Sequence, residues 1–387
     1  MNRFTFFWAV RKILRRSRLT GCMVLICLVT APLVLALVFS SSMMAGITNK
    51  YIYLSNGHIL VHGLSNIEPD KTNIIYVDTV ISGSALAYSS DSTASFVIKG
   101  ITNSYFNEQR QKQLTFITEE NINQSNLSGI TLSRKTAENL NVKIGDRIAL
   151  MIVPDSSNSV VAPKIVRVNS LFYSGYDQLD ENLAFVSYDY ARTLFPSEES
   201  ISTEILLSNS LMDKTNVITS NFNDNIKYST WDQNNISVYQ NFVTSRQMII
   251  IILLLISCVA AYYSANIAQQ MIQDDMVEIA TVKLIGGSNK LIVASSFISV
   301  FTVTLLGVII GFFLGLFISF NIGPFLSHLA ESGISAFSYY LLDFDITIPY
   351  SDIFLVLSSL LIISVISIFI SLRKTKRISP IQLFTSL

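Results

Sequence analysis

The sequence predicts a membrane protein with four transmembrane α-helices and a large α+β domain inserted between the first and the second. Only 14% of the 387 residues are charged, whereas soluble domains average about 25%. The deficit is concentrated in four windows without Asp, Glu, Lys or Arg. Each window is at least as long as the roughly 20 residues that a helix needs to cross a bilayer.

The windows divide the chain into nine segments. Basic residues precede the first window, as in a signal peptide, but a signal peptide has an apolar core of only about 7 to 15 residues. We therefore expect an uncleaved first span that continues beyond the membrane as helix. The predicted spans are residues 19–45, 247–270, 291–320 and 352–372, and the remaining segments are residues 1–18, 46–246, 271–290, 321–351 and 373–387.

Lysine and arginine predict the orientation, because they are enriched in short cytoplasmic segments. The first 18 residues hold six, the connector after the second window two and the tail four, whereas residues 321–351 hold none. We therefore expect both termini and the connector to be cytoplasmic. Aromatic and basic residues at helical spacing in residues 3–16 indicate an amphipathic helix at the membrane surface, and a plain basic flank explains them equally well.

The inserted domain, with about 200 residues, is large enough to bury its own core, and it contains no cysteine. Ser133 and Ser187 each precede a short helical pattern as an N-cap, and residues 145–146 mark a Gly-Asp turn. The proline-bounded, serine-rich residues 154–163 are predicted to be an exposed loop. The predicted strands are residues 58–63, 147–153 and 164–175.

The third span carries Gly307, Gly311 and Gly315 at a spacing of four. This spacing lines one helix face with small residues and allows another helix, of this chain or of a second copy, to approach closely. The alternative is that glycine is simply commoner in membrane helices. We expect Gly323–Pro324 to end this span.

The sequence shows no sign of catalysis. It has no P-loop motif, and no acidic residue lies in a charge-free window to serve a proton relay. His58 and His62, four apart in a predicted strand, would lie about 13 Å apart, too far to share a metal ion. We therefore expect neither catalysis nor a metal site on this chain, and work across a membrane would need energy from elsewhere.

The connector after the second span is long enough for a short helix. Asp274 and Asp275 suit a helix N-terminus, the pair Gly286–Gly287 suits its C-terminal stop, and Ser288 can cap the third span. Val277, Ala280 and Leu284 would share one face of this helix. The sequence predicts either a helix that crosses the cytoplasmic surface and docks a partner, or a plain extension of the second span.

Two segments resemble a known class. The connector "MVEIATVKLIGGSNKLI" is similar to the cytoplasmic signature of FtsX/MacB-class ABC transporter permeases, in which an acidic-Ile-Ala stretch is followed by a Leu-Gly-small-Ser turn. The tail "SLRKTKRISPIQLF" is similar to the basic ending of that class. One long outer domain after the first span, followed by three grouped spans, also resembles this class, and the outer domain is expected to have a MacB-like periplasmic core.

Within the class, the inserted domain is most similar to the LolC/LolE lipoprotein-releasing proteins. The similar stretches are "LSNGHILVHG", "LSRKTAENLNVKIGDRIALMIVP" and "PKIVRVNSLFYSGYDQLDENLAFVSYDYARTLF", and "LLDFDITIPYSDIFLVLSSLLI" is closer to LolE. The resemblance implies a bacterial inner-membrane complex of two permeases (two copies of this chain or a pair of paralogues) with two cytoplasmic ATPase subunits. It implies that a lipoprotein is extracted from the membrane lipid and passed to a periplasmic carrier.

The resemblance also implies sites. No cofactor is expected on this chain, because ATP and Mg belong to the partner ATPase, and the mildly acidic outer segment argues against nucleic acid. A loop at Pro154 to Pro163 matches a carrier-binding hook, and its shortness favours the paralogue without a working hook. The apolar ends of the first two spans offer a cleft for acyl chains, lined by Leu35, Val38, Met43, Met44, Met248 and Ile251. The ATPase-coupling residues are Asp275, Met276, Val277, Glu278, Ile279, Ala280, Thr281, Lys283, Leu284, Gly286 and Gly287.

Two other functions remain open at this point. One is a MacB-like efflux permease with a separate ATPase. The other is an FtsX-like regulator of cell-wall hydrolases, whose outer domain is usually about half this size.

Overall fold

The computed structural model describes residues 17–63, 74–89, 92–117, 129–152, 163–208, 227–286, 288–331 and 346–373. They belong to two compact units. The helical bundle comprises Met1–Met43, Asn241–His328 and Phe344–Leu387, and the inserted domain comprises Met44–Gln240 and Leu329–Asp343. The amphipathic helix predicted for residues 3–16 and the tail from residue 374 lie outside the described residues.

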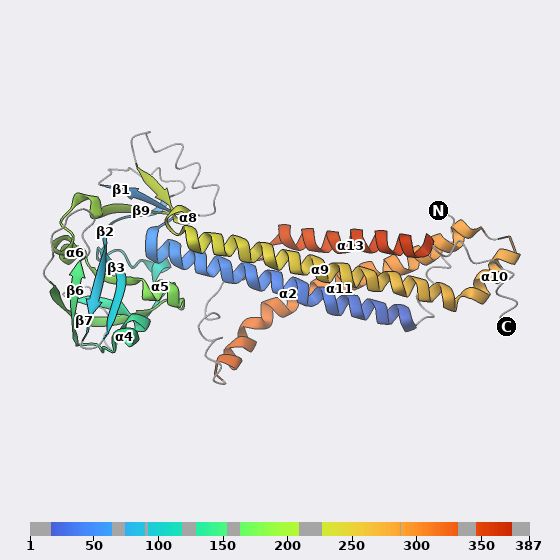
Figure 1. Ribbon diagram of the computed structural model, residues 1–387, viewed down its shortest axis with the longest axis horizontal. Helices are drawn as coiled ribbons and strands as arrows, with labels where there is room; N and C mark the ends of the chain where they lie inside the picture. The colour runs from blue at the N-terminus through green and yellow to red at the C-terminus, as the bar shows by residue number, and fades with distance from the viewer. Residues whose placement is uncertain are drawn as a thin grey trace. The chain divides into compact units, whose positions relative to one another are not determined.

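Four long helices take the place of the four predicted spans (Figure 1). All four are long and apolar enough to cross a bilayer, and a mixed α/β domain lies between the first and the second, so the predicted fold class is confirmed. With 35 residues at about 1.5 Å each, the first helix is longer than the roughly 30 Å hydrocarbon layer. The helices are α2 (Ser17–Tyr51), α9 (Ile236–Asp274), α11 (Asn289–Glu331) and α13 (Tyr350–Arg373).

All four helices extend past the bounds of the predicted spans. α2 continues as helix past residue 45, as expected, and α9 begins at Ile236 rather than near residue 247. Both additional stretches contain polar residues, which a hydropathy window excludes although they do not stop a helix. The predicted stop at Gly323–Pro324 was wrong for the helix, because α11 continues through it to Glu331. Membrane helices tolerate proline where neighbouring groups satisfy the freed backbone.

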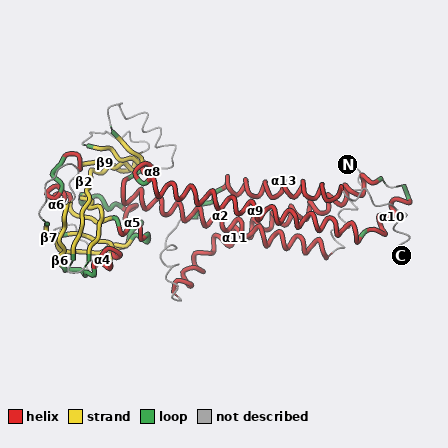
Figure 2. Tube along the Cα trace, in the orientation of Figure 1, coloured by secondary structure: helices red, strands yellow, loops and turns green. Residues whose placement is uncertain are grey.

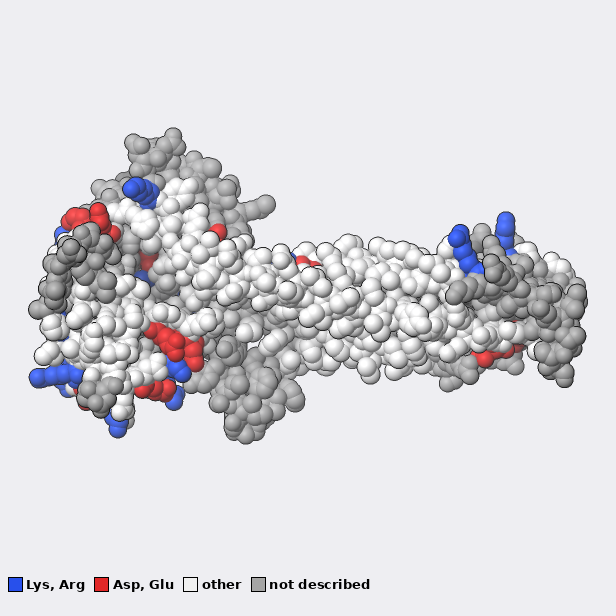
Figure 3. Space-filling model, viewed as in Figure 1, with Lys and Arg blue, Asp and Glu red and all other residues white. Residues whose placement is uncertain are grey.

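The core of the bundle is built from all four helices. Cys22 of α2, Ala268 of α9, Val300 of α11 and Leu360 of α13 are completely buried in one apolar cluster. On the face seen in Figure 3, charged side chains are nearly absent from the middle of the bundle, and lysine and arginine gather at the end that carries α10 (Met276–Leu284). This distribution suits helices that stand in lipid.

All described strands belong to the inserted domain (Figure 2). They form one sheet in the order β10-β1-β9-β2-β3-β8-β5-β7-β4, and β6 pairs with both β2 and β7. The strands are β1 (Ile59–His62), β2 (Ile74–Tyr88), β3 (Thr93–Ile101), β4 (Thr115–Ile117), β5 (Ile130–Ser133), β6 (Arg147–Ile152), β7 (Lys164–Tyr173), β8 (Leu183–Ser187), β9 (Ile201–Leu207) and β10 (Tyr228–Thr230).

The double pairing of β6 closes part of this sheet into a ring. Going round, β2 pairs with β3, β3 with β8, β8 with β5, β5 with β7, β7 with β6, and β6 again with β2. Two of these pairs, β3 with β8 and β5 with β7, are parallel, and the others are antiparallel. Closure removes exposed strand edges, which are otherwise open to aggregation.

The inner face of the ring carries the main core of the domain. Ile81 of β2, Ile98 of β3, Leu132 of β5 and Val168 of β7 are fully buried in one cluster. Helix α6 (Tyr188–Leu194) packs on the same face at two glycines. A methyl group added at Gly100 would lie 2.1 Å from the Ala191 side chain, and one added at Gly83 would meet Phe195. These two glycines therefore let α6 close over the core.

The opposite face of β2, β3 and β9 carries charge. Asp78 of β2 lies directly across from Glu204 of β9, and Ser82 lies across from Lys99 of β3. Because side chains alternate along a strand, Asp78, Lys99 and Glu204 all project from the face opposite to Ile81 and Ile98. Two carboxylates directly opposite each other destabilise a sheet unless cations accompany them.

Most predicted elements of the domain are confirmed. Ser133 caps α4 (Arg134–Leu140) and accepts a hydrogen bond from the Thr136 N–H at 3.0 Å, and Ser187 caps α6 in the same way. Gly145 has a φ of 98°, which fits the predicted turn. Strands β1, β6 and β7 lie where the alternation predicts them. The other seven described strands were not predicted.

Candidate functional site

The connector between α9 and α11 forms a short helix, α10, as one of the two alternatives predicts. Asp275 is the single non-helical residue between α9 and α10, and Figure 1 shows α10 turned out of line with α9. Gly286 adopts a φ of 93° directly after the helix, which suits a C-terminal stop. The Ser288 hydroxyl accepts the Leu291 N–H at 3.3 Å and caps α11.

The two sides of α10 differ in exposure. Ile279 is 5% exposed and belongs to the bundle core, with Val282 packed beside it. Val277 is 67% and Ile285 83% exposed, and Glu278 and Thr281 are also exposed. Val277, Glu278, Thr281 and Ile285 therefore form an exposed stripe among the described side chains. The side chains of Ala280, Lys283 and Leu284 and the whole of Gly287 lie outside the described residues.

Other predicted coupling residues lie away from this stripe. Asp275 is 1% exposed, so its carboxylate is buried where α9 meets α10. Met276 is half-buried at the start of α10. Among the described side chains of this connector, Val277, Glu278 and Thr281 of α10 and Ile285 just after it therefore form the surface that a partner can reach.

The glycines of α11 face α2 of the same chain. A methyl group added at Gly311 would lie 1.7 Å from the Thr30 hydroxyl, and methyl groups at Gly307 and Gly315 would lie 2.9 and 2.7 Å from backbone oxygens of α2. Methyl groups at these three positions would therefore force α2 and α11 apart. The spacing of four thus brings two backbones into contact within one chain.

Polar side chains also connect the helices of the bundle. At the end where α9 begins, Arg246 of α9 forms a two-point ion pair with Asp352 of α13, with distances of 2.8 and 2.7 Å. The Asp352 side chain is 12% exposed and that of Arg246 51% exposed. Near the other end, the Ser371 hydroxyl of α13 donates to the Ala265 carbonyl of α9 at 2.9 Å. The two contacts join α9 and α13 at both ends.

The residues proposed to line an acyl cleft occupy different environments. Val38 is 2% exposed within the bundle core, so its side chain offers no surface in this arrangement. Leu35, Met43 and Met44 are half-buried. Met248 and Ile251 are 58% and 52% exposed on α9. An apolar stripe continues from them along α9 through Ile252, Leu255, Ile256, Val259 and Tyr262.

The loop predicted to bind a carrier lies almost wholly outside the described residues. Pro154 is among the residues that are not described, whereas Pro163 is exposed just before β7. Ile165, two residues further, is 71% exposed.

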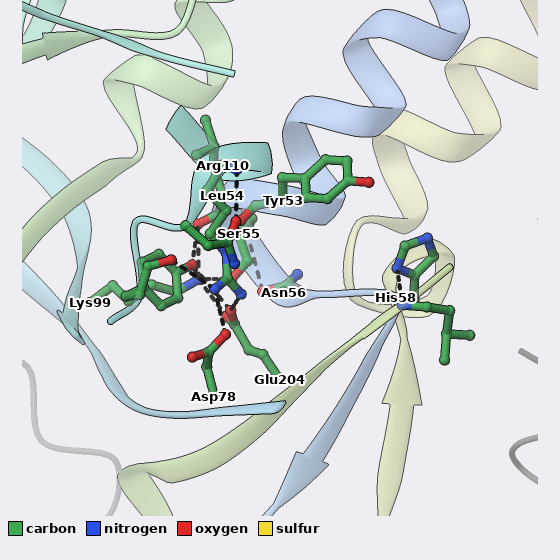
Figure 4. A network of polar contacts seen from close by, with 12 residues as sticks. Tyr53, Leu54, Ser55, Asn56, His58, Asp78, Lys99, Arg110 and Glu204 are labelled. Atoms are coloured by element: carbon green, nitrogen blue, oxygen red, sulfur yellow. Dashed lines mark hydrogen bonds and ion pairs between the residues drawn. The ribbon is translucent and has the colours of Figure 1, made fainter. Parts of the chain in front are cut away.

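A buried ionic cluster, which was not predicted, receives the end of α2. After Tyr51, α2 passes into the π-helical turn η1 (Ile52–Asn56). Figure 4 shows that the carbonyl groups of Tyr53, Leu54 and Ser55 meet cationic side chains from β3 and α3 (Glu108–Gln111), which in turn pair with carboxylates from β2 and β9. We call this cluster the helix socket, and it consists of Asp78, Lys99, Tyr105, Arg110 and Glu204.

The two cations of the helix socket hold the carbonyls of the turn. Lys99 Nζ donates to Leu54 O at 2.8 Å and also to Ser55 O, and it forms an ion pair with Glu204. Arg110 Nε donates to Tyr53 O at 2.9 Å. Lys99 and Arg110 are 2% and 0% exposed, so both charges stand entirely within protein.

The guanidinium of Arg110 is fixed on all sides. Its Nη1 pairs with Asp78 and donates to Tyr105 O, and its Nη2 lies 3.3 Å from Glu204 Oε2. The Tyr105 ring lies under it, 3.7 Å from centroid to guanidinium carbon. Two cations and two carboxylates thus neutralise one another. Burial lowers the pKa of Lys99 to about 8, although Glu204 opposes this effect.

A second polar contact lies one turn earlier. Lys50 at the end of α2 donates to Ser174 O and, at 3.5 Å, to Gln113 O. The Ser174 N–H donates to both carboxylate oxygens of Asp180 at 3.2 Å. Burial raises the pKa of Asp180 to about 6, and the hydrogen bonds from Ser174 partly offset this rise.

The sequence did contain a signal for the helix socket. Asp78, Lys99 and Glu204 each interrupt an apolar, strand-like run, namely "IIYVDTVI", "FVIKGI" and "ISTEILL". A charge in such a run is seldom buried unless it is paired. The missing information was the strand order, which brings three runs far apart in the chain to one sheet face.

Comparison with known proteins gives one family match. Residues 231–380 match the family described as FtsX-like permease C-terminal, and this segment contains α9, α10, α11 and α13. The match supports the predicted FtsX/MacB permease class, the permease component of an ABC transporter that works with an ATPase. The LolC/LolE assignment stays a prediction.

Solved structures similar to part of the chain include the extracellular domain of the noncanonic ABC-type transporter YknZ from Gram-positive bacteria. It has 16% identity and a TM-score of 0.27, and the match covers 42% of this chain and 86% of that chain. Comparison with curated proteins gave no match.

Proposed function

With an FtsX-like permease domain at residues 231–380 as the premise, we propose that this chain is the membrane subunit of an ABC complex that releases lipoproteins from the inner membrane. In this function two permeases bind two ATPase subunits. ATP hydrolysis then drives a lipoprotein from the bilayer to a periplasmic carrier.

The observation that carries the permease function is the exposed stripe of α10. Val277, Thr281 and Ile285 are spaced by four and lie on one side of the helix, while Ile279 anchors the opposite side in the bundle. Exposed aliphatic side chains next to an acidic residue suit a groove on a protein partner. We assign this stripe to the ATPase.

A pair of arginine substitutions tests the ATPase contact. We expect Val277→Arg with Ile285→Arg to lower ATPase binding by about tenfold or more, because apolar anchors dominate such interfaces. Co-purification and stimulated ATP hydrolysis measure the effect. Ile165→Arg, on an equally exposed isoleucine of the inserted domain, is the matched control. Full binding and stimulation by the double variant would refute the docking site.

The lipoprotein cargo is supported by the inserted domain and by α9. The stretches similar to LolC/LolE cover β1, β5 to β8, α4 and α6. The exposed stripe of α9 that starts at Met248 offers adaptable apolar contacts to an acyl chain. A polar or charged cargo would find no charged partner in the middle of these spans.

Depletion tests the cargo directly. Loss of the chain should leave outer-membrane lipoproteins in the inner membrane, as measured by membrane fractionation. Normal fractionation after complete depletion would refute lipoprotein release. Sensitivity to exported compounds would then favour the MacB-like efflux function, and a defect in cell-wall hydrolysis the FtsX-like function.

A further inference from the structure

The end of α2 meets an unusually polar environment. A helix leaves its last carbonyl groups without intrahelical partners and carries partial negative charge there. In this chain the final turn is π-helical, a rare conformation that is frequent at functional sites. The helix socket supplies an ammonium and a guanidinium to the carbonyls of Tyr53, Leu54 and Ser55.

Each member of the helix socket comes from a different part of the inserted domain. Asp78, Lys99 and Glu204 stand on three neighbouring strands, and Arg110 stands on α3. Figure 4 shows Arg110 and Lys99 between the turn on one side and the two carboxylates on the other. A pull on the turn is therefore transferred to β2, β3 and β9 together.

A buried ionic cluster is a costly way to stabilise a fold, because apolar residues of similar volume often do as well or better. Its advantage is geometric, since charged hydrogen bonds are short and directional and arginine fixes two partners in one plane. The apolar contacts of the turn, Ile52 with Leu206 and Trp231, lack such direction. The socket thus fixes the position of the turn more than it adds stability.

We propose that the helix socket is the joint through which α2 drives the inserted domain, with Lys99 and Arg110 as positioning residues for transport. This inference rests on the proposed function, because it needs a nucleotide-driven movement of the spans. Since α2 is one continuous helix from Ser17 to Tyr51, its end carries any such movement into the sheet only if the turn is held.

The chain contains a natural reporter of this joint. Trp231 is 6% exposed and packs against Ile52 of η1, and the only other tryptophan is Trp8. In a Trp8→Phe background the emission of Trp231 therefore reports on the seating of the turn. Backbone hydrogen exchange of residues 52–57 reports on the same turn independently.

The test uses the full chain with its ATPase in lipid nanodiscs. Lys99→Met with Glu204→Gln removes one charge of each sign and leaves Arg110 with polar acceptors. Arg110→Lys keeps the charge but cannot reach Tyr53 O and both carboxylates at once. Thr131→Val with Ser170→Ala, which removes a buried 2.7 Å hydrogen bond elsewhere in the sheet, is the matched control.

We expect the unmodified chain and the control to change their Trp231 emission when ATP with vanadate traps the complex. Both socket variants should lose most of this change, and exchange of residues 52–57 should quicken by about tenfold, as for the loss of a charged hydrogen bond. Their basal ATP hydrolysis should stay unchanged, because the α10 surface is intact.

Three results would overturn the joint: no nucleotide-dependent change in the unmodified chain, a full change in the socket variants, or unchanged exchange in those variants. Lipoprotein release is measured on the same samples. A complex that moves no lipoprotein but retains the emission change refutes the proposed cargo and leaves the joint supported, so the two failures are distinguishable.

Discussion

Asp180 shows how one buried acid makes stability depend on pH. Its carboxylate is fully buried and accepts the Ser174 N–H with both oxygens, and its pKa is raised to about 6 from 3.8, mainly by burial. The folded chain therefore holds this proton more tightly than the unfolded chain. The stabilising contribution is complete below about pH 3.8 and is lost as the pH rises through about 6.

We expect Asp180→Asn, which cannot ionise, to stabilise the inserted domain at pH 8 by roughly 1–3 kcal/mol relative to the natural chain. At pH 4 this gain should vanish or reverse. Urea unfolding of the Trp8→Phe chain, followed by Trp231 emission, measures the difference. Glu181→Gln, on an exposed position of the same short helix α5 (Asp177–Glu181), controls for the loss of a carboxylate, and an equal gain at both pH values would contradict the prediction.

The Arg246–Asp352 pair leads to an asymmetric prediction, because its members differ in burial. Removing the arginine leaves a carboxylate that is only 12% exposed, whereas removing the aspartate leaves a guanidinium that is 51% exposed. We therefore expect Arg246→Gln to destabilise the bundle by about 1–3 kcal/mol. Asp352→Asn should destabilise it by less than about 1 kcal/mol.

In a chain with Cys27 and Cys258 replaced, the buried Cys22 becomes reactive to a thiol reagent when the bundle unfolds on heating. The temperature at which it reacts measures this difference in stability. The double variant Arg246→Gln with Asp352→Asn should recover most of the loss, because no unpaired charge remains. If Asp352→Asn alone lowered the stability of the bundle more than Arg246→Gln, burial of the carboxylate would not be what makes breaking the pair costly.

At the scale of elements, the seam between α2 and α11 depends on the absence of side chains. We expect Gly311→Ala to separate the two helices and destabilise the bundle by about 1–3 kcal/mol, as overpacking does in a filled core. Thr30→Ala should restore part of this loss, because the added methyl group lies 1.7 Å from the Thr30 hydroxyl.

Gly21→Ala is the matched control for the seam, since a methyl group there meets nothing within 4 Å. Thermal denaturation followed at Cys22 compares the three variants. Equal stability of the Gly311 and Gly21 variants would mean that α2 and α11 do not touch at this seam in the membrane.

The elements also show what the sequence could and could not predict. Span number, the α10 helix and the caps Ser133 and Ser187 depend on neighbouring residues, so local patterns were sufficient. Strands β2, β3 and β9 were missed because Asp78, Lys99 and Glu204 break their apolar pattern. Those charges are compatible with burial only once long-range pairing brings Arg110 and both carboxylates together, and such pairing leaves no local trace.

The candidate functional site shows the same contrast between features set by neighbouring residues and features set by long-range packing. The α10 connector was identified from its length, charge and glycine stop, whereas the exposure of Val277, Thr281 and Ile285 was not predicted. A helix of nine residues has too little periodicity to fix its buried side, which depends on how Ile279 meets the bundle. The helix socket required the whole sheet.

At the scale of the whole molecule, the charge distribution makes a prediction about topology. Four spans place both termini on one side, and the excess of lysine and arginine in the first 18 residues, the connector and the tail places that side in the cytoplasm. On this prediction the inserted domain and α10 face opposite sides of the membrane. Exposed positions in each, Ile117 on β4 and Val277 on α10, are 39% and 67% exposed and suit thiol labelling.

In a chain whose three natural cysteines are replaced, we expect Ile117→Cys to react with a membrane-impermeant maleimide in spheroplasts. Val277→Cys should react only after the membrane is permeabilised, because charged reagents do not cross the hydrocarbon layer. Labelling of Val277→Cys in intact spheroplasts with protection of Ile117→Cys would reverse the orientation. It would also remove the ATPase from α10, because the nucleotide is supplied from the cytoplasm, so this one experiment tests the premise on which both the docking surface and the joint depend.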